Sequence, residues 1–223
     1  MDRRVGRWRL RLRQDGPDLA QAFALRAATF RGGACDRDAF DAGSRHLTIE
    51  TGGTLAGYAR VAVQDRAAML AGYAARTYDL SPLRARRAVE LGRVCLAPGE
   101  PDLPRLLLAA LAGLVDAEGA DLLYGCASFP PDARGALAGL RGHVAEGGPR
   151  RRAADAIDLP RGGTGPLPPL LRLYLAFGAR MSDHAVIDRD LGTVHVLAML
   201  RVADIPPHRL RHLGALAPVP AEG

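Results

Sequence analysis

The strongest constraint on the fold comes from the middle of the chain, where a strand, a helix and a second strand follow one another. The run VELGRVCLAP (89–98) has the apolar content of a buried strand. LPRLLLAALAGLVDAEG (103–119) places apolar residues at helical spacing, with Asp102 as its predicted N-cap and Gly119 at the C′ position. LLYGCASF (122–129) is the next strand. This order predicts a strand–helix–strand crossover within an α/β sheet.

The remaining elements extend this sheet. WRLRLR (8–13) alternates apolar residues with arginine, as in a half-buried strand. Further strands are predicted at 46–50, 55–63, 184–190 and 194–202, and helices at 19–30 with Asp18 as its N-cap, 132–142, 167–179 and 206–216. Residues 141–166, rich in Arg, Gly and Pro, indicate an irregular surface excursion. We therefore predict a single α/β domain over residues 1–223, with a mixed sheet flanked by helices and a core at about 8–204.

Composition narrows the class of protein. No run of about 18 apolar residues occurs, and the basic N-terminus lacks the apolar core of a signal peptide, so we expect a cytoplasmic protein. The three cysteines form no CxxC pair and the six histidines form no HxH pair, so no metal site is predicted. The net charge is +6, and all 30 basic residues are arginine. The absence of lysine indicates a codon bias, so the abundance of arginine is weak evidence for phosphate recognition.

Two charged residues, Glu90 and Arg93, interrupt the central strand 89–98. Buried charges need partners or a role. Residues three apart in a regular strand point to opposite faces, but a β-bulge at Gly92 would bring both side chains to one face. The pair is then either a carboxylate base with an orienting guanidinium or a structural ion pair between strands.

A second group of charges follows the first predicted helix. Asp38 and Asp41 lie three residues apart, beside Arg26 and Phe30 of the helix. The two carboxylates would suit a cationic substrate. The alternative is that Asp38 caps a helical turn and Asp41 is solvated.

These motifs together resemble the L-ornithine N-alpha-acyltransferases, the family of ornithine-lipid enzymes with an acetyltransferase-like (GNAT-type) fold. The matching stretches are LRAATF, RDAFDAGSRHL, TYDLSPL, VELGRVCLAP, DAEGADLLYGCASF, LPPLLRLYLAFGA and SDHAVIDRDLGTVHV. They run in family order from about residue 23 to 197, so the resemblance covers most of the chain.

A more distant similarity links the chain to the acyl-homoserine-lactone synthases. Their charged motifs correspond here to Arg26 with Phe30, Asp38 with Asp41, Arg60, and Glu90 with Arg93. The tryptophan typical of those synthases is absent, which disfavours S-adenosylmethionine as the amine donor.

The resemblance implies transfer of a fatty acyl group, commonly 3-hydroxylated, from acyl carrier protein to the α-amine of L-ornithine, which yields lyso-ornithine lipid. Glu90 would be the base and Arg93 its catalytic partner. Predicted substrate contacts are Arg26, Phe30, Asp38, Asp41, Arg60 and Ser128, the last from the GCASF motif. No cofactor is expected beyond the acyl-phosphopantetheine of the carrier protein.

The segment between strand 89–98 and the next helix also concerns the donor. Acetyl-coenzyme-A-dependent enzymes place a Gly-rich, basic, diphosphate-binding loop there. Residues 97–104 instead contain two acids and three prolines, which favours a carrier-protein thioester.

Alternative functions are an acyl-homoserine-lactone synthase, which would consume S-adenosylmethionine, and a basic module that binds nucleic acid or membrane. The strand-embedded Glu90 and the few aromatic residues disfavour nucleic acid. The basic, amphipathic N-terminus would suit peripheral contact with the anionic inner face of the cytoplasmic membrane.

Overall fold

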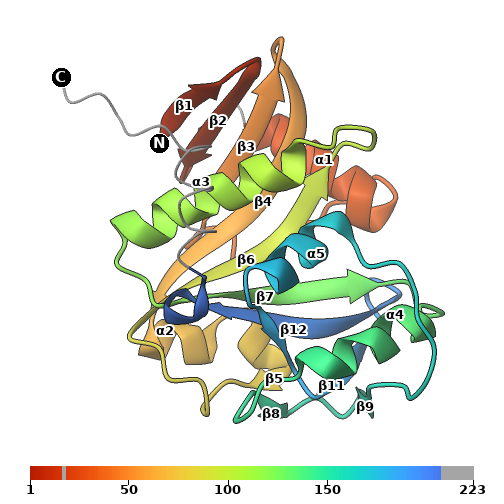
Figure 1. Ribbon diagram of the computed structural model, residues 1–223. Helices are drawn as coiled ribbons and strands as arrows, with labels where there is room; N and C mark the ends of the chain where they lie inside the picture. Colours follow the sequence, from red (N-terminus) through yellow and green to blue (C-terminus); the bar gives the residue numbers. More distant parts are fainter. Residues whose placement is uncertain (17–18, 207–223) are drawn as a thin grey trace. The chain divides into compact units, whose positions relative to one another are not determined.

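The computed structural model describes residues 1–16 and 19–206 (Figure 1). It divides into two compact units: unit 1, which contains Met1–Val63 and Leu91–Gly119, and unit 2, which contains Gln64–Glu90 and Ala120–Ile205. The boundary between the units falls within two strands, β4 (Thr54–Asp65) and β6 (Arg87–Leu96). The extent of the acyltransferase domain, 1–223, remains a prediction.

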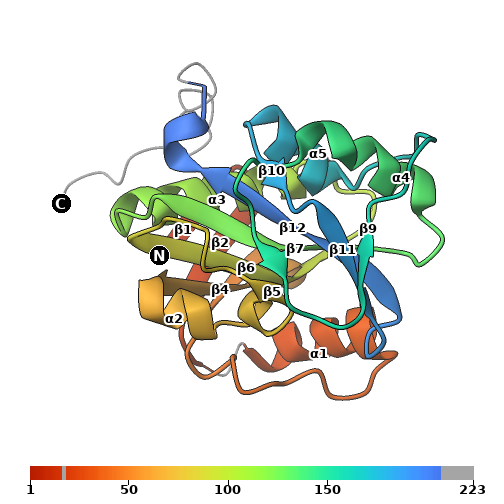
Figure 2. The same cartoon turned by 90° about the horizontal axis from the view of Figure 1, so that it is seen from below.

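Unit 1 contains the strand order β1-β2-β3-β4-β6 and two helices. Its other elements are β1 (Asp2–Val5), β2 (Trp8–Arg13), α1 (Leu19–Arg31), β3 (Arg45–Thr51) and α3 (Leu103–Ala117). Strands β1 to β4 pair antiparallel, and positive φ angles of 57° and 79° at Gly52 and Gly53 form the tight turn between β3 and β4. Helices α3 and α1 cover opposite faces of these strands (Figures 1 and 2). The buried residues of α3 are all apolar, whereas α1 buries Leu19, Ala22 and the charged Arg26.

Unit 2 continues the order as β6-β7-β12-β11-β9, with β10 paired to β12. Its elements are α2 (Arg66–Ala71), η1 (Ala74–Arg76), β5 (Tyr78–Asp79), β7 (Leu122–Phe129), α4 (Arg134–Gly139), η2 (Leu140–His143), β8 (Arg150–Arg151), β9 (Ala156–Asp158), α5 (Pro169–Ala176), β10 (Arg180–Met181), β11 (His184–Asp188), β12 (Thr193–Arg201) and η3 (Val202–Asp204). An apolar cluster that includes Met69, Tyr78, Leu80 and Tyr124 packs against these strands.

The α/β class, the mixed sheet with flanking helices and the crossover are confirmed. β6 and β7 are neighbours, and α3 lies between them in the sequence. Asp102 occupies the N-cap position of α3, as predicted, but its backbone is helical (φ −77°, ψ −27°) and its side chain makes no capping hydrogen bond within the described part of the chain. Gly119 follows the C-cap at a φ of 59°, as predicted.

The predicted irregular excursion at 141–166 is more ordered than expected. It contains the end of η2 and the short strands β8 and β9, of which β9 pairs with β11. Such short strands are set by tertiary pairing, because two or three residues carry no periodicity of their own. The predicted cap Asp18 and, apart from Pro206, the predicted helix 206–216 lie outside the described residues. Within the described part, no helix is long and apolar enough to cross a membrane.

Candidate active site

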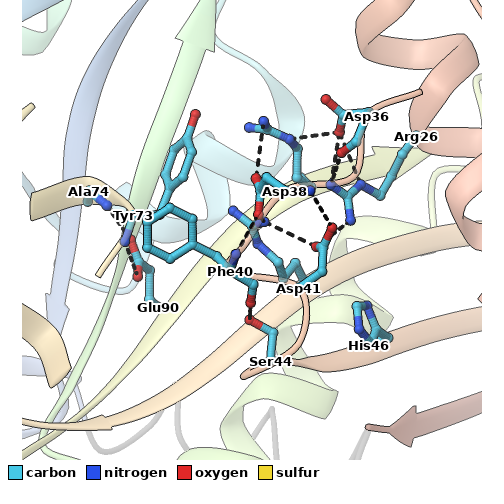
Figure 3. A network of polar contacts seen from close by, with 12 residues as sticks. Arg26, Asp36, Asp38, Phe40, Asp41, Ser44, His46, Tyr73, Ala74 and Glu90 are labelled. Atoms are coloured by element: carbon cyan, nitrogen blue, oxygen red, sulfur yellow. Dashed lines mark hydrogen bonds and ion pairs between the residues drawn. The ribbon is translucent and has the colours of Figure 1, made fainter. Parts of the chain in front are cut away.

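Unit 1 contains a buried cluster of arginines and aspartates between α1 and the strands, which we call the charge cluster: Arg26, Arg31, Asp36, Asp38, Asp41, Arg60 and Arg93. Arg26 is fully buried (Figure 3). Its Nη1 donates to Asp41 Oδ1 at 2.6 Å and its Nε to Asp36 Oδ2 at 3.1 Å. Burial lowers the pKa of Arg26, but the hydrogen bond and charge of Asp41 outweigh this effect and raise the pKa overall.

Asp36 is the hub of the charge cluster, and the motif analysis missed it. Its side chain is buried and accepts from Arg26, from Arg31 Nε at 3.1 Å and from Arg93 Nε at 2.8 Å. Arg26 also donates to the Asp36 carbonyl oxygen. The signal in the sequence was a third aspartate two residues before Asp38.

Asp38 and Asp41 lie together, but arginines surround them. Asp41 Oδ1 accepts from Arg26 and from Arg60 Nη1 at 3.1 Å, and Asp41 Oδ2 accepts from the Asp38 N–H. Burial raises the pKa of Asp41, but these hydrogen bonds and charges lower it overall. The open anionic cage expected for a cationic substrate is therefore compensated by guanidinium groups.

Asp38 is the less saturated of the two carboxylates. Its Oδ1 accepts from Arg60 Nη1 at 2.5 Å and from the Phe40 N–H at 2.9 Å. Its Oδ2 is buried and accepts no hydrogen bond, although Arg93 Nη2 lies 3.6 Å away. The Asp38 side chain is 24% exposed, against 8% for Asp41, so Asp38 is the carboxylate that a ligand can reach more easily.

The predicted irregularity in β6 falls one residue later than Gly92. Arg93 has a φ of 52° and is the one non-glycine residue of the described chain in the left-handed region. This conformation breaks the two-residue period of the strand. The Arg93 guanidinium lies 5.6 Å from the centre of the Phe30 ring and pairs with Asp36, so residues from two different motifs lie together here.

An aromatic pair borders the charge cluster. His46 Nδ1 lies 2.7 Å from the Tyr58 hydroxyl, to which Arg26 Nη1 donates at 3.3 Å. Burial lowers the pKa of His46 and raises that of Tyr58 to about 12. Both groups are therefore uncharged near neutral pH.

Glu90 belongs to unit 2 and sits in a different environment. Its Oε1 accepts from the Ala74 N–H at 2.7 Å and its Oε2 accepts from the Tyr73 N–H at 3.3 Å (Figure 3). Gln64 Nε2 also donates to Oε2, at 3.0 Å. The side chain is 6% exposed. N–H donors thus hold and orient a buried carboxylate.

The predicted site residues therefore fall into two groups. Arg26, Phe30, Asp38, Asp41, Arg60 and Arg93 belong to unit 1, whereas Glu90 and Ser128 belong to unit 2. Ser128 is exposed on β7 and pairs with His195 of β12 in the antiparallel register. The catalytic and substrate-binding roles of these residues remain predictions.

Comparison with known proteins gives the family. Residues 21–100 match the acetyltransferase (GNAT) domain model. An L-ornithine N(alpha)-acyltransferase from Rhodobacter capsulatus is 31% identical over 86% of this chain and 89% of its own length. The chain belongs to the L-ornithine Nα-acyltransferase family. A second member, from Rhizobium meliloti, is 29% identical over 81% of this chain and 71% of its own.

Solved structures agree on the fold of this acyltransferase. FeeM, an N-acyl amino acid synthase from uncultured soil microbes, has a TM-score of 0.54 at 12% identity and covers 91% of this chain and 93% of its own. MesI, a CoA-dependent acyl-homoserine lactone synthase, also has a TM-score of 0.54 at 12% identity, with coverages of 96% and 97%. At this identity the likeness concerns the GNAT fold alone.

Proposed function

We propose that this acyltransferase moves a fatty acyl group, commonly 3-hydroxylated, from acyl carrier protein to the α-amine of L-ornithine, which yields lyso-ornithine lipid. The observation that carries the proposal is the 31% identity to the Rhodobacter enzyme over 86% of this chain.

Glu90 supplies the base in this scheme. The ornithine ammonium gives one proton to the carboxylate, directly or through a water, and the amine attacks the thioester carbonyl carbon. A C–N bond forms and the C–S bond breaks. The second proton passes from the nitrogen to the thiolate, which leaves as a thiol, and Glu90 releases the first proton to solvent. General base catalysis contributes about 10²–10⁴-fold. Because the amine attacks directly, no cysteine nucleophile is needed; burial accordingly raises the pKa of Cys95 to about 11.

The charge cluster supplies groups for the amino acid. Asp38 is the better candidate for an ammonium group, because its side chain is 24% exposed, against 8% for Asp41. Arg60 and Arg93 are the guanidinium groups beside it, with Phe30 against Arg93. Arg26 is fully buried, so it would act by holding Asp36 and Asp41 in place.

The donor is proposed from the segment before α3. Glu100 pairs with Arg7 at 2.5 Å, and Asp102 lies beside the first turn of the helix. Negative side chains at this position disfavour the diphosphate of coenzyme A, which a carrier-protein thioester does not carry.

The test combines purified protein with matched 3-hydroxyacyl thioesters of carrier protein and of coenzyme A, with L-ornithine, L-lysine or S-adenosylmethionine as acceptor. Mass spectrometry of the products identifies both the head group and the linkage. We expect N-acyl-ornithine, formed faster from the carrier-protein thioester. Acyl-homoserine lactone as the product would refute the proposal, and faster transfer from coenzyme A would refute its donor.

Glu90→Gln tests the base within the same assay. We expect kcat to fall by about 10²–10⁴-fold. Glu146→Gln is the matched control, because it makes the same chemical change at an exposed carboxylate and should leave kcat unchanged. Full activity of Glu90→Gln at neutral pH would remove Glu90 from the mechanism.

A further inference from the structure

Glu90 is backed by a buried pair of polar side chains, Gln64 of β4 and Tyr124 of β7. Gln64 Nε2 donates to Glu90 Oε2 at 3.0 Å, and the Tyr124 hydroxyl donates to Gln64 Oε1 at 2.6 Å. Gln64 is 7% and Tyr124 2% exposed. All three residues belong to unit 2.

The donors and acceptors in the Tyr124–Gln64–Glu90 hydrogen-bond series follow from the hydrogens that each group carries. A phenol has a single hydrogen, and the short contact places it on the amide oxygen of Gln64. The amide nitrogen must then face the Glu90 carboxylate. Without the phenol, the amide could rotate and present its oxygen to the carboxylate, which would replace an attraction with a repulsion.

Tyr124 is itself firmly held. Its ring belongs to the apolar cluster of unit 2, together with Met69, Tyr78 and Leu80. Burial and the charge of Glu90 raise its pKa, so the hydroxyl stays protonated and keeps its donor role throughout the physiological range.

The backbone at Gly72 lies against Gln64 and Glu90. A Cβ atom on Gly72 would lie 2.6 Å from Gln64 Nε2 and 2.8 Å from Glu90 Oε2. Those distances are shorter than side-chain contacts allow, so a larger residue at position 72 would force the two polar groups to shift. The next two residues, Tyr73 and Ala74, then supply their N–H groups to the carboxylate.

We propose that Gln64 is a positioning residue that holds the Glu90 carboxylate for acyl transfer, and that Tyr124 fixes the orientation of the Gln64 amide. The inference rests on the proposed function, in which Glu90 is the base. Side chains that lock a reacting group within a fraction of an ångström typically control the rate more than the binding of substrate.

The experiment is a double-mutant cycle on the full chain with Gln64→Met, Tyr124→Phe and the double variant, assayed with 3-hydroxyacyl carrier protein and L-ornithine. We expect Gln64→Met to lower kcat by about 10- to 100-fold, within the range of general base catalysis, with both KM values changed less than about threefold. Tyr124→Phe should lower kcat by less, up to about tenfold. If Tyr124 acts on Glu90 only through Gln64, the double variant should be no slower than Gln64→Met.

A pH profile separates positioning from mere packing. Loss of the Gln64 hydrogen bond removes a donor to the ionised carboxylate, so the acidic limb of the kcat profile should move to higher pH in Gln64→Met. A purely structural role would change the unfolding midpoint without moving this limb. Tyr174→Phe is the matched control, because the buried Tyr174 hydroxyl has no hydrogen-bond partner among residues 1–16 and 19–206, and the kcat of this variant should equal that of the wild type.

The outcomes are distinct. Wild-type kcat and an unmoved acidic limb in folded Gln64→Met would overturn the positioning role while leaving ornithine acylation intact. Additive losses in the double variant would overturn the action of Tyr124 through Gln64. Absence of ornithine acylation by the wild type would instead refute the proposed function itself.

Discussion

The charge cluster of unit 1 and the Glu90 site of unit 2 both bury carboxylates, but they compensate the charge in different ways. Asp36 receives three guanidinium groups, whereas Glu90 accepts hydrogen bonds from two backbone N–H groups and one amide. Opposite charges hold a carboxylate in its ionised form and fix the segments that carry them. The N–H groups that donate to Glu90 are dipoles rather than ions, so they orient the carboxylate without themselves forming an ion pair with it.

The largest expected effect tests the structural side of this comparison. Asp36→Asn keeps the size of the side chain but leaves Arg26, Arg31 and Arg93 without their shared counter-charge. We expect the free energy of unfolding to fall by about 3–5 kcal/mol, the usual cost of breaking a buried ion pair. Urea unfolding at pH 7 measures it.

Asp158→Asn is the matched control, since that aspartate is 85% exposed and pairs with Arg151 at the surface. Its unfolding midpoint should equal that of the wild type. If Asp36→Asn also left the unfolding midpoint unchanged, the charge cluster would not stabilise unit 1.

Gly72→Ala tests the Glu90 side. The added methyl group would meet Gln64 Nε2 and Glu90 Oε2, so these groups must shift. We expect the free energy of unfolding to fall by about 1–3 kcal/mol from overpacking. The fall in kcat, expressed as an activation free energy, should be larger than this. Gly139→Ala serves as control, because a Cβ there meets nothing within 4 Å. A stability loss with wild-type kcat would show that Glu90 needs no fixed position.

Arg93 distinguishes backbone strain from charge. Arg93→Ala and Arg93→Gly both remove the guanidinium that pairs with Asp36, but only glycine adopts a φ of 52° without steric cost. We expect Arg93→Gly to be the more stable of the two variants by about 1 kcal/mol, as measured by thermal unfolding. Equal stabilities would mean that the strand relaxes once the ion pair is lost.

The smallest expected effect is on the pH dependence of the free energy of unfolding. Burial lowers the pKa of His46 below its ordinary 6.5, so below that pH the unfolded chain binds a proton that the folded chain does not. Stability is therefore retained above about pH 6.5 and falls as the pH is lowered toward the folded-state pKa. Urea unfolding at pH 7.5 and 5.5 should show this loss, and His46→Gln should reduce it. An unchanged slope in His46→Gln would assign the loss to other groups, such as His195, whose pKa burial also lowers.

Much of the fold followed from the sequence, because long apolar periods are local signals. The strands 8–13 and 122–129 have the bounds that alternation and apolar content predicted, and α3 lies where the helical stripe placed it. The sequence did not predict five short strands: β1, β5, β8, β9 and β10. Each of them depends on a partner strand that the local pattern does not identify.

The candidate site divides in the same way. By itself, the sequence determined that charged residues interrupt a buried strand at Glu90 and Arg93, since charges in an apolar run are visible without any structure. Only the tertiary structure decided which partners compensate them: Asp36 for Arg93, and Gln64 with the N–H groups of Tyr73 and Ala74 for Glu90. The reason is physical, because a buried charge selects its partners by distance in space, and these partners lie 16 to 57 residues away along the chain.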